Sequence, residues 1–250
     1  MTQRYESNEA LGPLAADVAS AALALARSFA AEATLWCSAP HASEHAQHVA
    51  VEFVHPVIMG KRALPAVAVT AGEADPVGVL RSHVRSGDVI LVVEADAADR
   101  DVMAVLRRAP SWGATTIWIG AGNRPPAGVA DHVLWSGGDP ALAPHDGRFV
   151  LIYHLLWELT HVCFEHPGLL RPDVTCDGPV CITCSDEGTL AEVVQATAVT
   201  ATVRTAGGVE RIDTTLVGCV RPGDLVLVHA GTALTVVDEA PANERQRVHQ

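Results

Sequence analysis

Two kinds of apolar segment alternate over the first two thirds of the chain. Helix-forming stretches, the first of them rich in alanine, are separated by short apolar runs typical of buried strands. The pattern predicts helices over residues 9–30, 43–59, 77–84, 98–109 and 148–165, and strands over 34–38, 65–70, 88–94, 115–120 and 131–135. Ser43 is placed to cap the second helix. Strands that alternate with helices form a parallel sheet covered on both faces, so this region is predicted to be a doubly wound α/β sandwich.

The pattern changes at residues 166–179, where three prolines and two glycines in fourteen residues indicate a linker. Short β segments follow, and Gly207–Gly208 and Pro222–Gly223 separate some of them as turns. About 60 residues of short strands suit a small, OB-like β-barrel. We predict an α/β domain over 1–166, a linker over 167–180, a barrel over 181–240 and a polar tail over 241–250.

The charge balance limits the partners. Among 250 residues, 17 are Lys or Arg and 29 are Asp or Glu, which gives a net charge of −12 at pH 7. Nucleic acids and anionic membranes favour clustered basic side chains, so neither is expected as a partner. No apolar run reaches the ~18 residues of a membrane span, and the polar N-terminus lacks the basic start of a signal peptide. We expect a cytoplasmic protein.

The six cysteines fall into two groups. The first lies among apolar residues, where a buried and inert cysteine is the usual explanation: Cys37, Cys163 and Cys219. The second lies within nine residues among Asp, Gly, Pro and Ser: Cys176, Cys181 and Cys184. The CxxC that two of these form leaves zinc binding, redox chemistry and chance open, because no second ligand pair follows in sequence.

The segments VCITCSDEGTLAEVV, GGVERIDTTLV and RPGDLVLVHAGTALTVVDE resemble the HypC/HupF family of nickel–iron hydrogenase maturation chaperones. The resemblance runs from Cys181 to Glu239. It implies a small β-barrel that helps a scaffold protein to build the Fe(CN)2CO unit and delivers that unit to the hydrogenase large-subunit precursor. Cys181 matches the family's essential cysteine and His229 its characteristic histidine.

A thiolate at Cys181 is a soft donor that suits low-spin iron, and His229 could add a ligand or lower the pKa of the thiol. The family places its cysteine directly after the initiator Met, whereas 180 residues precede Cys181 here. A free α-amino group beside the thiol is therefore absent, and Cys184 or Cys176 is the candidate auxiliary thiol.

The α/β region contains two pairs of metal-ligating residue types. His48 and Glu52 have the i, i+4 spacing that places both on one helix face. Asp146 and His154 lie eight residues apart, about two helical turns. Together they could form a tetrahedral zinc-type site if the two helices pack together. The spacing alone also suits a core histidine and a solvated glutamate.

Residues 9–166, with AQHVAVEF and YHLLWEL as motifs, resemble the phosphoheptose isomerase branch of the sugar isomerase (SIS) domain family. The resemblance implies a homotetramer that isomerises sedoheptulose 7-phosphate at subunit interfaces, often with zinc. His48, Glu52 and His154 match the family's metal and catalytic residues, and Asp146 stands where the family has Gln. The matching glutamate and histidine serve there as base and acid.

The loops that should bind a sugar phosphate differ from the family pattern. The loop after the first strand is CSAPHAS, which contains no glycine. The loop after VILVV contains Glu94, Asp96 and Asp99, which would repel a phosphate dianion. The departures argue against phosphosugar isomerisation and leave a scaffold that retains a metal site, or an enzyme for an unphosphorylated substrate.

The sequence therefore favours a hydrogenase maturation accessory protein that handles the Fe(CN)2CO intermediate through Cys181. Its partners would be the hydrogenase large-subunit precursor and the iron-assembly scaffold protein, and its SIS-like domain would supply homo-oligomerisation or docking. Two alternatives stay open: a metal-dependent isomerase with an appended chaperone-like domain, and a thiol redox or zinc-storage module built on the clustered cysteines.

Overall fold

The computed structural model describes residues 11–58, 60–70, 75–171 and 188–239. Its contacts divide the chain into two units. The first contains Met1–Arg107 and Thr115–Asp173, and the second contains Arg108–Ala114 and Val174–Gln250. The division near residue 173 lies within the predicted linker.

The first unit is built on a five-stranded parallel sheet in the order β2-β1-β3-β4-β5. Its strands are β1 (Leu35–Ser38), β2 (Ala66–Val69), β3 (Val89–Val93), β4 (Thr115–Ala121) and β5 (His132–Ser136). Its helices are α1 (Leu11–Ala30), α2 (Ser43–Val54), α3 (Pro76–His83), α4 (Arg100–Arg108) and α5 (Arg148–Glu165). The predicted doubly wound α/β fold is confirmed.

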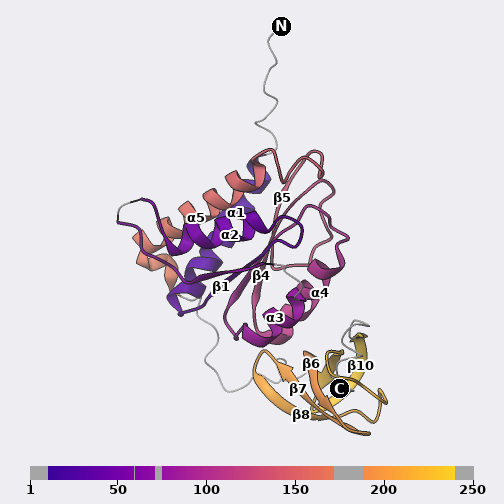
Figure 1. Cartoon of the computed structure of the whole chain (residues 1–250). Helices are drawn as coiled ribbons and strands as arrows, with labels where there is room; N and C mark the ends of the chain where they lie inside the picture. The colour runs from indigo at the N-terminus through magenta and orange to yellow at the C-terminus, as the bar shows by residue number, and fades with distance from the viewer. Residues whose placement is uncertain (1–10, 59, 71–74, 172–187, 240–250) are drawn as a thin grey trace. The chain divides into compact units, whose positions relative to one another are not determined.

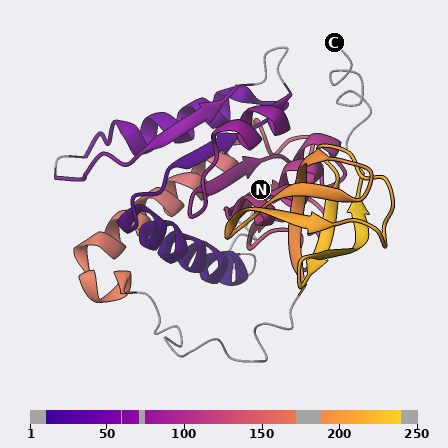
Figure 2. The same ribbon diagram turned by 90° about the horizontal axis from the view of Figure 1, so that it is seen from below.

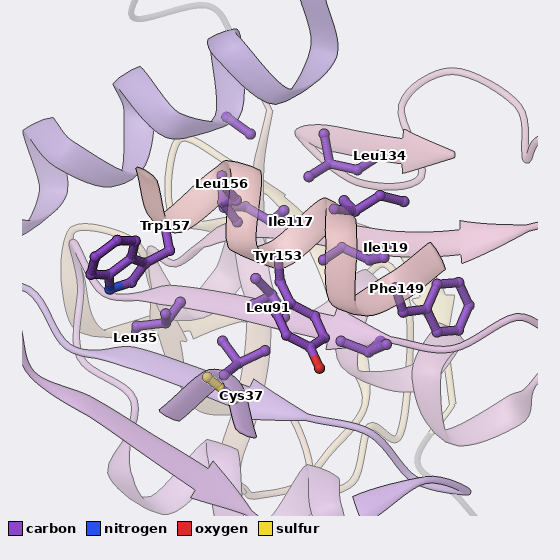
Figure 3. Packing of buried hydrophobic residues seen from close by; sticks show 14 of the residues in the cluster. Leu35, Cys37, Leu91, Ile117, Ile119, Leu134, Phe149, Tyr153, Leu156 and Trp157 are labelled. Atoms are coloured by element: carbon purple, nitrogen blue, oxygen red, sulfur yellow. The ribbon is translucent and has the colours of Figure 1, made fainter. Parts of the chain in front are cut away.

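The sheet is covered on both faces, with α1, α2 and α5 on one and α3 and α4 on the other (Figure 1). All five residues of β3 are buried, as a strand between two helical layers requires. The apolar core on the α1–α2–α5 face includes Leu91 and Ile119 from the sheet and Tyr153 and Trp157 from α5 (Figure 3). This packing fixes α5 next to α2.

Two local predictions for α2 are wrong. The helix ends at Val54 and not near residue 59, because Pro56 disfavours helical geometry at the preceding residue, His55. Ser43 is the first helical residue and not the cap, since Ala42 holds that position and no side chain caps the helix.

The second unit contains a closed barrel of five strands in the order β10-β8-β7-β6-β9 (Figure 2). The strands are β6 (Thr189–Ala196), β7 (Thr200–Thr205), β8 (Gly208–Asp213), β9 (Leu225–His229) and β10 (Thr232–Asp238). Alternate residues of β7 are buried, as the wall of a filled barrel requires. The small β-barrel predicted from the sequence is confirmed.

Residues Arg108–Ala114, which run from the last residue of α4 to the start of β4, belong to the second unit. The Trp112 indole N–H donates to Glu192 Oε2 at 2.7 Å. The guanidinium of the fully buried Arg108 donates to Asp238 at 3.1 Å and lies 3.5 Å from the Glu192 carboxylate. Ala191 and Val193, on either side of Glu192 in β6, belong to the apolar barrel core, so Glu192 points to the outer face of the strand. Its buried carboxylate needs partners there, and Arg108 and Trp112 supply them.

Within the described ranges, no helix is both long and apolar enough to cross a bilayer.

Gly120 of β4 lies too close to Trp135 and Glu94 for a larger residue to fit. A Cβ on Gly120 would overlap the Trp135 indole ring and lie 2.8 Å from the Glu94 carbonyl oxygen. Gly120→Ala should therefore lower the free energy of unfolding by about 1–3 kcal/mol, the usual cost of overpacking. The urea midpoint measures the effect.

Gly137→Ala is the matched control, because a Cβ on Gly137 would meet no atom within 4 Å. Equal midpoints for the two variants would contradict the packing described around Gly120.

Candidate metal centre

Three side chains from two helices converge on the surface of the first unit. His48 and Glu52 come from α2, and His154 comes from α5; one potential ligand atom from each lies within 4.8 Å of the others. The His48 Nε2 atom is 3.3 Å from His154 Nε2 and 3.3 Å from Glu52 Oε1. The His154 Nε2 atom is 3.8 Å from the same carboxylate oxygen. The structure therefore brings together three of the four ligands predicted from the sequence.

The spacing of these atoms fits a metal ion. For metal–ligand bonds of ~2.0–2.1 Å, two corners of a tetrahedron lie about 3.3 Å apart. Two of the three separations have this value, and the third is 3.8 Å. Two imidazoles and one carboxylate form a donor set that zinc uses in catalytic sites with an open fourth position. The residues present thus fit zinc.

The two helices are joined at this site by hydrogen bonds from α5. The Trp157 indole N–H donates to the backbone carbonyl of Glu52 at 2.8 Å. The Tyr153 hydroxyl lies 2.8 Å from His48 Nδ1. Burial, with a contribution from the Glu52 charge, raises the pKa of Tyr153 to about 12, so its hydroxyl keeps its proton at neutral pH. Both contacts fix the ligand-bearing turns of α2.

Asp146, the fourth predicted ligand, does not join the group. Its carboxylate accepts hydrogen bonds from the Arg148 backbone N–H at 3.0 Å and from Arg148 Nε at 2.6 Å. Asp146 precedes α5, which begins at Arg148, and Gly147 between them has a left-handed φ of 81°. The eight-residue spacing to His154 therefore does not correspond to two helical turns.

A second candidate region lies at the carboxyl edge of the sheet. In the strand order 2-1-3-4-5, ligands bind outside the carboxyl ends where the order reverses, between β1 and β3. Near the ends of β3 and β4 the structure has a cavity of about 560 Å³, whose lining includes Glu94, Asp96 and Asn123. This is the position at which the sequence predicts repulsion of a phosphate.

The acidic residues of this edge bind the backbone amides that an anion would need. Glu94 accepts from the Asp96 N–H at 2.9 Å, and Asp96 accepts from the Ala98 N–H at 2.8 Å. Asp99 accepts from the Val102 N–H at 2.8 Å, at the start of α4. The chain's own carboxylates thus occupy donors of the kind that hold phosphate in other proteins.

Protonation at this edge follows from its contacts. Burial raises the pKa of Glu94, although the Asp96 N–H and the nearby His41 act in the opposite direction. The hydrogen bond from His41 Nε2 to Asp99, 2.8 Å long, raises the pKa of His41. The region is therefore acidic but contains one histidine that favours its charged form.

The barrel holds one of the predicted iron-handling residues. His229 is the last residue of β9 and is half-buried. The clustered cysteines Cys176, Cys181 and Cys184 lie outside the described residues. Cys37 and Cys163 are buried as predicted, whereas Cys219 is exposed, because it lies in the connection between β8 and β9 and not in a strand.

Sequence reasoning missed the residues that support the metal ligands, which are His45, Tyr153 and Trp157. A signal was available for all three. His45 precedes His48 by three positions on α2, and Tyr153 and Trp157 share a face of α5 at i, i+4 spacing.

The C-terminal part of the chain matches a family model. Residues 188–248 match the HupF/HypC family. The matched segment contains the whole barrel from β6 to β10 and includes His229, and it begins after Cys181.

The N-terminal region matches phosphoheptose isomerases in sequence and structure. It is 28% identical over 158 residues to the phosphoheptose isomerase of Desulfovibrio desulfuricans, a match that covers 57% of this chain and 75% of that protein. The phosphoheptose isomerase of Francisella tularensis has a TM-score of 0.52 at 18% identity, over 62% of this chain and 90% of that one. The Neisseria gonorrhoeae enzyme has a TM-score of 0.52 at 17% identity, over 61% and 90%. The two structural matches show the fold.

The raised pKa of Glu94 predicts a pH-dependent stability. Its pKa is higher in the folded chain than in the unfolded chain, so its contribution favours the folded state at low pH and is lost as pH rises through the raised pKa. Glu94→Gln removes the buried charge and keeps an oxygen to accept from Asp96. The variant should melt at a higher temperature than wild type at pH 7, and the difference should close below about pH 4, near the ordinary glutamate pKa.

Glu210→Gln, at an exposed position of β8, is the control and should leave the melting temperature unchanged. A Glu94→Gln variant that melts below wild type at pH 7 would show that the charge of Glu94 stabilises the fold.

Proposed function

We propose that the chain is a hydrogenase maturation accessory protein whose barrel handles the Fe(CN)2CO intermediate. The observation that carries the proposal is the match of residues 188–248 to the HupF/HypC family, together with the closed five-stranded barrel over the same residues. The iron unit is the cargo. It would come from an iron-assembly scaffold protein and pass to the hydrogenase large-subunit precursor.

In this proposal Cys181 holds the iron through its thiolate, a soft donor suited to low-spin iron. Cys181 lies shortly before the matched segment in sequence. Cys184 would serve as an auxiliary thiol. His229, half-buried at the end of β9, would supply an imidazole in this proposal.

The α/β unit would hold a zinc ion through His48, Glu52 and His154, which supply two imidazole nitrogens and a carboxylate oxygen. A bound zinc ion would supply Lewis-acid chemistry at this position. Apolar side chains exposed next to the ligands support the proposed homo-oligomer: Val51 on α2 and Leu151 and Leu155 on α5, with exposed fractions of 55%, 53% and 40%.

A second candidate function is a metal-dependent isomerase with an appended barrel. The convergence of His48, Glu52 and His154 favours it, because a carboxylate and an imidazole at one site can act as base and acid. The carboxylates of Glu94, Asp96 and Asp99 argue against a phosphorylated substrate, since they occupy the backbone donors at the sheet edge.

The proposed function predicts an infrared signature. Full-length protein purified without oxygen from a host that assembles active hydrogenase should show CN and CO stretching bands. Cys181→Ala should abolish these bands, because the thiolate is the proposed iron donor. Cys219→Ala is the matched control and should retain them, since Cys219 is an exposed cysteine elsewhere in the same barrel unit.

Absence of the bands in wild-type protein from a host with active hydrogenase would contradict the proposal. The same protein turning over sedoheptulose 7-phosphate, with the activity lost in Glu52→Gln, would favour the isomerase in its place.

A further inference from the structure

A chain of hydrogen-bonding groups leads from the backbone before α5 to the metal ligand His48. The Pro144 carbonyl oxygen lies 2.9 Å from His45 Nε2. His45 Nδ1 lies 3.5 Å from the Tyr153 hydroxyl, which in turn lies 2.8 Å from His48 Nδ1. The link between His45 and Tyr153 is the longest of the three.

The Pro144 carbonyl, at the start of this series of hydrogen bonds, decides which group donates and which accepts at each link. A backbone carbonyl can only accept, so His45 Nε2 must carry the proton. In a neutral imidazole the other nitrogen is then an acceptor, which leaves His45 Nδ1 to accept from the Tyr153 hydroxyl. A buried acceptor without a donor is costly, and His45 is only 6% exposed. When the Tyr153 hydroxyl donates its one proton to His45, its oxygen is left to accept from His48 Nδ1–H.

We propose that Tyr153 and His45 are positioning residues that hold His48 as the Nδ1–H tautomer, with the Nε2 lone pair facing Glu52 and His154. The inference deepens the zinc site of the proposed function and rests on it. A histidine binds a metal through an unprotonated nitrogen, and the hydrogen bond made by its other nitrogen decides which one that is. In the metal-free protein His48 Nε2 can then accept a hydrogen bond from His154 Nε2, and when His154 loses that proton the two imidazoles and Glu52 offer three electron-pair donors to one metal ion.

Ring packing holds the hydrogen-bonded side chains in place. The His45 ring contacts the rings of Phe149 and Tyr153 edge to face, with centroids 5.6 Å and 6.0 Å apart. The Tyr153 ring meets the His48 ring in the same way at 5.1 Å. Tyr153 is 1% exposed, and its ring lies in the apolar core (Figure 3). Neither supporting ring can turn without displacing core side chains.

The tautomer can be measured without metal. Nitrogen chemical shifts of the imidazoles, recorded about two units above the ordinary histidine pKa of ~6.5, distinguish Nδ1–H from Nε2–H. Metal-free wild-type protein should show His48 as Nδ1–H. Tyr153→Phe and His45→Phe should both move it to Nε2–H, which can donate to Glu52. A wild-type His48 in the Nε2–H form would overturn the proposal.

Zinc affinity gives a second readout. Zinc chloride titrated into the full chain should bind 10- to 100-fold more weakly to Tyr153→Phe, the usual effect of losing such a partner. Thr160→Val is the control, because it removes another buried hydroxyl from α5, one that donates to the Leu156 carbonyl oxygen of the same helix. Its affinity should equal that of wild type.

Tyr153→Phe with wild-type zinc affinity and a wild-type melting temperature would also overturn the proposal. The nitrogen chemical shifts test the tautomer of His48, and the zinc titration tests the zinc site of the proposed function, so the failure of one can be told from the failure of the other. Wild-type protein that has His48 as Nδ1–H but binds no zinc would support the hydrogen bonds from His45 to His48 and rule out the zinc site.

Discussion

The contact of α5 with α2 is the constraint on which the candidate metal centre depends. The indole of Trp157 binds the backbone of Glu52, and the hydroxyl of Tyr153 binds His48, both at 2.8 Å. Tyr153 and Trp157 belong to the core that joins these helices to the sheet. Since the supporting side chains are buried and the ligands are partly exposed, the core sets the position of a group at the surface.

The two candidate regions of the α/β unit differ in the charge of the ligand that each could bind. The group of His48, Glu52 and His154 brings two imidazoles and a carboxylate within 4.8 Å of one another, an arrangement that suits a cation. At the sheet edge, by contrast, Glu94, Asp96 and Asp99 have already bound the backbone donors that an anion would use. Metal binding is thus compatible with this fold, while the phosphate part of a sugar-phosphate site is filled by the chain itself. This combination favours the proposed scaffold role of the α/β unit over phosphosugar isomerisation.

Patterns local in sequence predicted much of this structure. The alternation of helices and strands gave the parallel sheet, and the i, i+4 spacing of His48 and Glu52 placed both on one face of α2. Spacing was misleading for Asp146, because α5 begins only at Arg148 and helical geometry does not extend before it. The roles of Tyr153 and His45 depend on partners about a hundred residues away, which helix propensity and periodicity do not encode.

A crystal of the full chain grown with zinc, measured at the zinc absorption edge, decides whether the pair of helices α2 and α5 binds the metal. We expect one anomalous peak per chain in the α/β unit, ~2.0–2.2 Å from His48 Nε2, a Glu52 carboxylate oxygen and His154 Nε2. A peak at the cysteines Cys176, Cys181 and Cys184 instead, with none at the helix pair, would contradict it and favour a zinc-storage module.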